Sequence, residues 1–185
     1  MLSLVPNLLT LLRIAACPVL VLVLNARNYE VALLLFFFAG VTDALDGYIA
    51  KRFDCATYVG SILDPIADKL LITCAYVMLT ILGDIPFYLL VVVIFRDLVI
   101  IGGYFIILLV TQERVPIQPI YWSKLNTFLQ IFLVVVVLVE SSGWLSLGPV
   151  QATLVLGVIV TSLVSGALYV WMWGFKRQAV GEKRP

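Results

Sequence analysis

Residues 43–68 read DALDGYIAKRFDCATYVGSILDPIAD, and the charged residues in this segment are the main guide to the fold. It places four aspartates, Asp43, Asp46, Asp64 and Asp68, within two apolar runs that flank a short polar connection. An ionised carboxylate in the middle of a membrane span costs about 2.5–3.5 kcal/mol on an insertion scale, so such side chains are kept only with partners. We therefore expect a helical bundle in which the four carboxylates meet one another or a cation.

Apolar runs of about 20 residues, the length that a membrane-crossing helix needs, continue on both sides of this stretch. Of the 185 residues, 63% are apolar and only 12% are charged, about half the charged share of roughly 25% in soluble domains. The sequence predicts an all-α integral membrane protein, with one transmembrane domain over residues 1–175 and a polar cytoplasmic tail over 176–185. The six expected transmembrane helices cover residues 8–26, 31–50, 57–82, 85–110, 119–139 and 149–173.

The basic residues between these runs predict the orientation in the membrane. Six crossings put both termini on one side, and cytoplasmic loops carry the excess of Lys and Arg. Because the first run lacks the pattern of a cleaved signal peptide, we expect it to be an anchor in a bacterial inner membrane. With the termini cytoplasmic, the opposite side keeps only Arg27, and the cytoplasmic side collects Lys51, Arg52, Arg114, Lys124, Lys176, Arg177, Lys183 and Arg184.

Composition also removes several classes of function. The chain contains no histidine, which excludes a Ser-His-Asp triad and a His-ligated zinc or haem. Its formal net charge is +1, too small to favour a nucleic-acid partner. Catalysis must therefore use carboxylates, lysine, arginine or a metal.

The spacing of the four aspartates favours a metal site. Asp43 and Asp46 are three residues apart, and Asp64 and Asp68 are four apart, so each pair shares one helix face. Because the connection between the two runs is short, the pairs should converge in the cytoplasmic half of the bundle. Two divalent cations would balance four negative charges, and an oxygen-only ligand set suits Mg²⁺, Mn²⁺ or Ca²⁺ better than Zn²⁺.

Two other interpretations of the aspartates stay open. They could form buried salt bridges, or they could form the proton relay of a small proton-coupled transporter. Gly47, Ala50 and Gly60 lie in register with the aspartates and leave room beside the metals, although small residues also serve close helix packing. The candidate partners for salt bridges are Lys51, Arg52, Lys69 and Arg96.

The pattern Asp43-x2-Asp46-Gly47-x2-Ala50-Lys51-x8-Gly60-x3-Asp64-x3-Asp68 resembles the signature of the CDP-alcohol phosphatidyltransferases. Every fixed position but one is met, since Lys51 stands where the family carries arginine. Lysine cannot form the planar two-pronged contact of arginine with phosphate. The resemblance continues in three segments along the chain, namely Pro6-Asn7-x2-Thr10-x2-Arg13, Arg96-Asp97 and Ser123-Lys124-x-Asn126-Thr127-x2-Gln130.

The resemblance implies six membrane helices, usually a homodimer, and an active site that opens to the cytoplasm. It implies two divalent cations, Mg or Mn, held by Asp43, Asp46, Asp64 and Asp68, with Asp68 also the general base. The reaction would transfer a phosphatidyl group from CDP-diacylglycerol to an alcohol and release CMP. The CDP group would be bound by Gly47, Ala50, Lys51, Gly60, Asn7 and Thr10.

The basic residues around the acceptor should indicate how much negative charge the acceptor carries. Arg96, Lys124, Asn126 and Arg114 are the candidate acceptor-binding residues, since arginine forks match phosphate oxygens. Alternatively, Arg96 pairs with its neighbour Asp97, and Lys124 extends to the membrane interface. The segments SKLNTFLQ and RD resemble the eukaryotic-type cardiolipin synthases more than the phosphatidylglycerophosphate synthases, where a second lysine usually replaces Asn126. The sequence thus favours phosphatidylglycerol as the acceptor, with glycerol 3-phosphate as the alternative.

Overall fold

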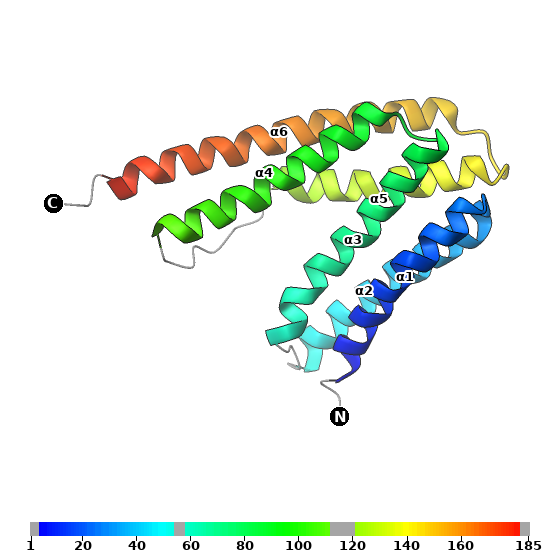
Figure 1. Cartoon of the computed structure of the whole chain (residues 1–185), viewed down its shortest axis with the longest axis horizontal. Coiled ribbons are helices and arrows are strands. Elements are labelled where there is room, and N and C mark those ends of the chain that lie inside the picture. The colour runs from blue at the N-terminus through cyan, green and yellow to red at the C-terminus, as the bar shows by residue number, and fades with distance from the viewer. Residues whose placement is uncertain (1–3, 54–57, 112–120, 182–185) are drawn as a thin grey trace. The chain divides into compact units, whose positions relative to one another are not determined.

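The computed structural model describes residues 4–53, 58–111 and 121–181, and the side chains of residues 10–42, 67, 69–103 and 121–172. All regular structure in these residues is helical, with no strand (Figure 1). The six helices are α1 (Leu4–Asn25), α2 (Tyr29–Phe53), α3 (Tyr58–Leu82), α4 (Phe87–Thr111), α5 (Tyr121–Ser141) and α6 (Gly148–Gly181).

Each helix coincides with one apolar run and differs from the predicted span mainly at its ends. Helix α2 continues through Lys51 and Arg52 to Phe53, because lysine and arginine are good helix formers and do not end a helix. For the same reason α6 continues to Gly181, so residues 176–181 of the predicted polar tail are helical. Hydropathy therefore locates the apolar part of a helix and not its full length.

The chain divides into two compact units. Unit 1 contains Met1–Ile85 and Val134–Gly148, and unit 2 contains Pro86–Leu133 and Pro149–Pro185. Helix α5 contributes to both, since its residues up to Leu133 belong to unit 2 and the rest to unit 1.

In unit 1, helix α1 packs against both α2 and α3 (Figure 1). Large apolar side chains such as Leu20, Leu24, Tyr76 and Leu79 are fully buried. Small side chains, including Ala32, Ala67 and Ala75, are buried as well, and small residues let helices in a membrane approach closely. This packing brings the ends of α2 and α3 that carry the signature residues to the same end of unit 1 (Figure 1).

Hydrogen bonds at the helix ends fix the turn between α1 and α2. Arg27 adopts a left-handed conformation with φ 55°, and its N–H donates to the carbonyl of Leu24 while the N–H of Asn28 donates to that of Val23. These two bonds form the Schellman motif that commonly ends a helix. The side-chain oxygen of Asn28 then accepts from the N–H of Val31 at 3.4 Å and caps the N-terminus of α2.

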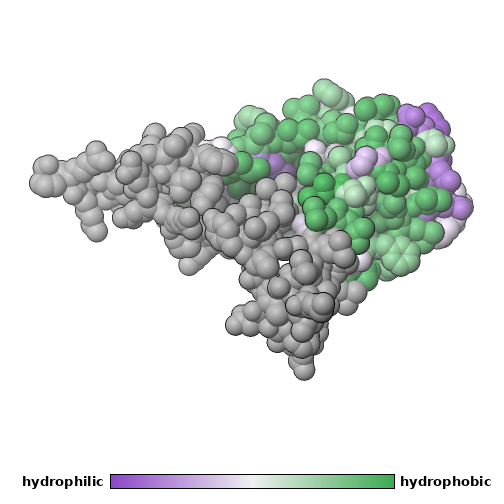
Figure 2. Space-filling model, turned by 60° about the horizontal axis from the view of Figure 1, so that its bottom comes forward, coloured by the Kyte–Doolittle hydropathy of each residue, from purple (hydrophilic) through white to green (hydrophobic). Residues whose placement is uncertain are grey.

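Side-chain contacts tie the helix ends together at the opposite end of unit 1 from the signature residues, where α2 begins and α3 ends. The Tyr29 hydroxyl donates to the Asp84 carboxylate at 2.9 Å, which joins the start of α2 to the turn after α3. The Trp144 indole N–H donates to Glu30 at 3.0 Å. On the face that Figure 2 shows, most of the described surface is hydrophobic, and hydrophilic residues lie mainly along one edge, with a few within the hydrophobic area.

The surface of the helices fits a lipid environment. Many large apolar side chains are exposed, for example Leu22, Phe38, Ile81 and Phe95, each at more than 60%. Among the residues with described side chains, two segments are long and apolar enough to cross a membrane, Tyr121–Ser141 and Gly148–Met172. The structure thus supports the predicted all-α membrane protein with two candidate spans, and six crossings stay a prediction.

Candidate active site

The signature aspartates lie in two helices of unit 1. Asp43 and Asp46 belong to the last three turns of α2, and Asp64 and Asp68 to the first three turns of α3. Their side chains lie outside the described set, as do those of the CDP-binding candidates Gly47, Ala50, Lys51, Gly60 and Asn7. The predicted metal and CDP contacts therefore stay predictions, supported here by the helical backbone that carries them.

Two polar residues of α1 are buried against these helices. Thr10, a CDP-binding candidate, is fully buried, and Arg13 is only 3% exposed. The sequence predicted no role for Arg13, although an arginine inside an apolar run is a signal for function. A buried guanidinium in the unit that holds four aspartates is suited to bind an anion or balance a carboxylate.

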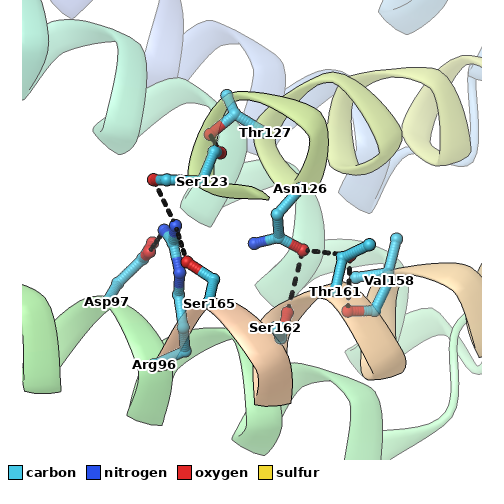
Figure 3. Close-up of polar contacts among 9 residues, drawn as sticks. All are labelled: Arg96, Asp97, Ser123, Asn126, Thr127, Val158, Thr161, Ser162 and Ser165. Carbon is cyan, nitrogen blue, oxygen red and sulfur yellow. Dashed lines mark hydrogen bonds and ion pairs between the residues drawn. The ribbon is translucent and has the colours of Figure 1, made fainter. Parts of the chain in front are cut away.

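Unit 2 contains a group of polar side chains that we call the polar ladder, formed by Arg96, Ser123, Asn126, Thr161, Ser162 and Ser165 (Figure 3). Its first rung is centred on Arg96, whose side chain is 4% exposed. The Nη1 group of Arg96 pairs with the Asp97 carboxylate at 2.7 Å. Its Nη2 group donates to the hydroxyls of Ser123 on α5 and of Ser165 on α6, the latter at 2.9 Å.

The second rung is centred on Asn126, which is fully buried. Its carboxamide oxygen accepts from the Thr161 hydroxyl at 2.8 Å and from the Ser162 hydroxyl at 3.0 Å. Both donors come from α6. Because Ser123 precedes Asn126 by three residues and Ser165 follows Ser162 by three, the rungs lie one helical turn apart.

Two nitrogen donors of the polar ladder have no acceptor among the described residues. These are Nε of Arg96 and Nδ2 of Asn126, both buried. Leaving a buried donor unsatisfied costs about 1–3 kcal/mol, and such groups in a folded protein call for an explanation. Two buried donors without a described acceptor, one in each rung, are complementary to a ligand that only accepts hydrogen bonds, such as a phosphate.

A cavity of about 330 Å³ lies between α4 and α6 beside the ladder. Arg96 and Ser162 line it, and the rest of its wall is apolar, with Phe95 and Leu163 among the residues. The small residues Gly166 and Ala167 leave this space open.

The structure separates the predicted acceptor-binding residues. It brings Arg96 and Asn126 into one polar cluster, whereas Lys124 is exposed on α5 and Arg114 lies outside the described residues. The ion pair with Asp97 confirms the alternative prediction that Arg96 pairs with its neighbour, yet this pair occupies only one nitrogen of the guanidinium. The residues of α6 were missed, although Thr161, Ser162 and Ser165 form one polar face on an apolar helix.

No group of three acidic or cysteine side chains that could hold a metal occurs where side chains are described. The side chains of the four aspartates lie outside that set, so the metal site stays a prediction.

Comparisons with known proteins establish the class of the chain. Residues 3–172 match the CDP-alcohol phosphatidyltransferase family. A CDP-diacylglycerol--glycerol-3-phosphate 3-phosphatidyltransferase from Rickettsia bellii is 36% identical over 141 residues, which cover 75% of this chain and 76% of that protein. A probable phosphatidylglycerophosphate synthase from Mycobacterium tuberculosis is 33% identical over 170 residues, 89% of this chain and 78% of that protein.

A cardiolipin synthase (CMP-forming) from Homo sapiens is also similar, 35% identical over 145 residues that cover 70% of this chain but 48% of that protein. The chain belongs to the CDP-alcohol phosphatidyltransferase family. It is accordingly an enzyme of phospholipid biosynthesis, and the alternative of a proton-coupled transporter is set aside.

The Rickettsia bellii relative is named for glycerol 3-phosphate, the alternative to phosphatidylglycerol, which the sequence favoured as the acceptor. That preference relied on the amide at position 126 carrying no charge. In the structure the oxygen of this amide faces α6 and its nitrogen is left as a donor. A neutral side chain in this orientation can still bind phosphate, so the absence of lysine is a weak guide to the acceptor.

Proposed function

We propose that the protein transfers the phosphatidyl group of CDP-diacylglycerol to the primary hydroxyl of glycerol 3-phosphate and releases CMP. The observation that carries the choice of acceptor is the similarity to a relative named for glycerol 3-phosphate, which extends over 76% of that protein. The two unpaired donors of the polar ladder support it, because glycerol 3-phosphate carries a free phosphate.

Asp43, Asp46, Asp64 and Asp68 are the proposed metal ligands. Asp43 lies ten residues before the end of α2 and Asp68 ten residues after the start of α3. At 1.5 Å per residue, both then lie about 15 Å from the connection between the helices, a depth that suits a shared site. Two Mg²⁺ or Mn²⁺ ions bound there would neutralise the diphosphate and stabilise the departing CMP.

Asp68 is the proposed general base. The acceptor hydroxyl loses its proton to the Asp68 carboxylate, and its oxygen forms a bond to the phosphorus that carries diacylglycerol. The bond from this phosphorus to the bridging oxygen breaks, and CMP leaves with that oxygen. Gly47, Ala50 and Gly60 are proposed to leave space for the CDP group, with Lys51, Asn7 and Thr10 as further contacts.

Arg96 and Asn126 are the proposed acceptor-binding residues, with Lys124 and Arg114 as additional cations. The Arg96 guanidinium is held in place by Asp97, Ser123 and Ser165, so little conformational entropy remains to be lost when an anion binds. Its Nε and the Nδ2 of Asn126 offer one donor from each rung to the phosphate.

Phosphatidylglycerol is the second candidate acceptor, favoured by the similarity to the human cardiolipin synthase. We further propose a homodimer in a bacterial inner membrane, with both termini and the active site cytoplasmic. Bacterial relatives and the two apolar helices support the membrane location.

The acceptor is tested by incubating the purified protein with CDP-diacylglycerol, Mg²⁺ or Mn²⁺ and one acceptor at a time. We expect CMP release with glycerol 3-phosphate, and the lipid product should carry two phosphates. Glycerol, which has the same reacting hydroxyl but no phosphate, is the matched control and should release little CMP. CMP release with phosphatidylglycerol and none with glycerol 3-phosphate would overturn the proposed acceptor.

A further inference from the structure

We propose that Ser162 of α6, assisted by Thr161, is a positioning residue that sets specificity for the acceptor by fixing the orientation of the Asn126 carboxamide. The inference rests on the proposed function, in which Asn126 binds the acceptor phosphate. Neither residue needs to touch the substrate. They determine whether the substrate meets the NH₂ group or the oxygen of the amide.

A carboxamide has one side that accepts hydrogen bonds and one that donates them. The Ser162 and Thr161 hydroxyls both lie on the oxygen side of Asn126. With the oxygen held there, the NH₂ group points away from Thr161 and Ser162, toward the side where Arg96 lies (Figure 3). Rotation of the amide by half a turn would present its oxygen to an anionic ligand and repel it.

Ser162 is the stronger of the two determinants. The Thr161 hydroxyl has one hydrogen, and the carbonyl oxygens of Gly157 and Val158 on its own helix compete for it at 2.8 and 3.2 Å. The Ser162 side chain is 1% exposed. Among the described contacts its hydroxyl donates to Asn126, with no competing carbonyl of α6. Removing the Ser162 hydroxyl should therefore release the amide while leaving the helix intact.

The test uses the full-length protein in detergent and measures kcat and both KM values from CMP release. We expect Ser162→Ala to raise the KM for glycerol 3-phosphate about 3- to 10-fold, the effect of one lost hydrogen bond. The KM for CDP-diacylglycerol and kcat should stay within about 2-fold, a margin well below one hydrogen bond. Ser162→Thr should restore the KM, because it keeps the hydroxyl and its methyl has room in the cavity that Ser162 lines.

Two further variants separate positioning from a general structural role. Thr153→Ala removes an exposed hydroxyl of the same helix that bonds only the Pro149 carbonyl among the described contacts, and it should leave all constants unchanged. In an Asn126→Ala background, Ser162→Ala should have no further effect on the KM, since the two residues then share one role. An equal effect in both backgrounds, or failure of Ser162→Thr to restore the KM, would overturn the inference.

The proposed acceptor and the positioning role can fail separately. If the wild-type protein uses phosphatidylglycerol and not glycerol 3-phosphate, the proposed function is wrong. The variants are then measured with phosphatidylglycerol, whose phosphodiester also accepts hydrogen bonds. An unchanged KM for that acceptor in Ser162→Ala would overturn the positioning role, and a raised KM that Ser162→Thr restores would support it.

Discussion

The amide of Asn126 can do part of what a lysine would do in a buried phosphate site. An ammonium group loses much of its hydration when buried, whereas a carboxamide is neutral and costs far less to bury. The positive charge of the polar ladder comes from Arg96, and Asp97 already offsets it. If the acceptor binds here as we propose, its recognition depends on correctly oriented hydrogen-bond donors more than on net charge.

Replacing Asn126 with Asp tests this view, because the side chains have nearly the same shape. An aspartate offers at most one donor when protonated and repels phosphate when ionised. We expect Asn126→Asp to raise the KM for glycerol 3-phosphate at least 10-fold, equivalent to about 1.4 kcal/mol, with an unchanged KM for CDP-diacylglycerol. The exposed helix cap Asn28 is the matched control, since aspartate caps equally well and Asn28→Asp should leave both constants unchanged.

Sequence alone could identify Arg96, its partner Asp97 and Asn126, but not the hydroxyl groups of α6 that hold Arg96 and Asn126. A polar residue in an apolar run is conspicuous at any position. Serine and threonine are less informative, because in helices they often bond the carbonyl one turn back, as Thr80 and Thr153 do here. Lys124 is an example of the opposite error. Its basic charge alone suggested that it belongs to the acceptor site, but it is exposed, although it lies only two residues from the buried Asn126.

At the scale of helices, the contacts at the ends determine how α2 and α3 are held in unit 1. The Tyr29 hydroxyl bonds the Asp84 carboxylate. Partial burial raises the pKa of the Tyr29 phenol above its ordinary value of 10.0, and the bond to Asp84 raises it further. The fold therefore favours the neutral phenol.

This shift predicts how stability depends on pH. The contribution of Tyr29 to the free energy of unfolding is fully present below the unfolded-state pKa of about 10. It is lost as the pH rises through the higher folded-state pKa. We expect Tyr29→Phe to lower the unfolding temperature in detergent at pH 8, with the difference from wild type shrinking as the pH is raised above 10. Tyr88→Phe is the control at an exposed tyrosine. A difference that grows above pH 10 would contradict the assignment.

The helices themselves were largely predictable from sequence. Apolar runs locate the six described helices, because side chains that face lipid or pack in a core are apolar. The ends were less predictable. The turn after α1 contains Arg27 in a left-handed conformation, whereas the usual pattern for such a helix end has glycine or asparagine at this position. The turn after α3 follows the pattern, with Gly83.

For the molecule as a whole, composition predicted the membrane environment, and the aspartate pattern predicted the family that the comparisons confirm. The acceptor was the part that sequence could not fix. In our proposal it depends on the direction of the Asn126 amide and on two buried donors without a described acceptor, which are properties of the folded core. The two acceptors differ by a diacylglycerol group remote from the reacting hydroxyl, so a single residue type is a poor discriminator.

The whole reaction should depend on divalent metal and on Asp68 in separable ways. Chelation should abolish CMP release, and added Mg²⁺ or Mn²⁺ should restore it, because four carboxylates without cations repel one another and cannot bind a diphosphate.

Asp68→Asn should lower kcat by about 10²- to 10⁴-fold, the usual contribution of a general base, and no metal concentration should restore it fully. Asp84→Asn, which changes a carboxylate in the turn after α3, is the matched control and should keep full activity. Undiminished turnover after chelation would contradict the metal site, whereas an active Asp68→Asn variant would contradict the roles proposed for Asp68, as base and as ligand, without affecting the other three proposed ligands.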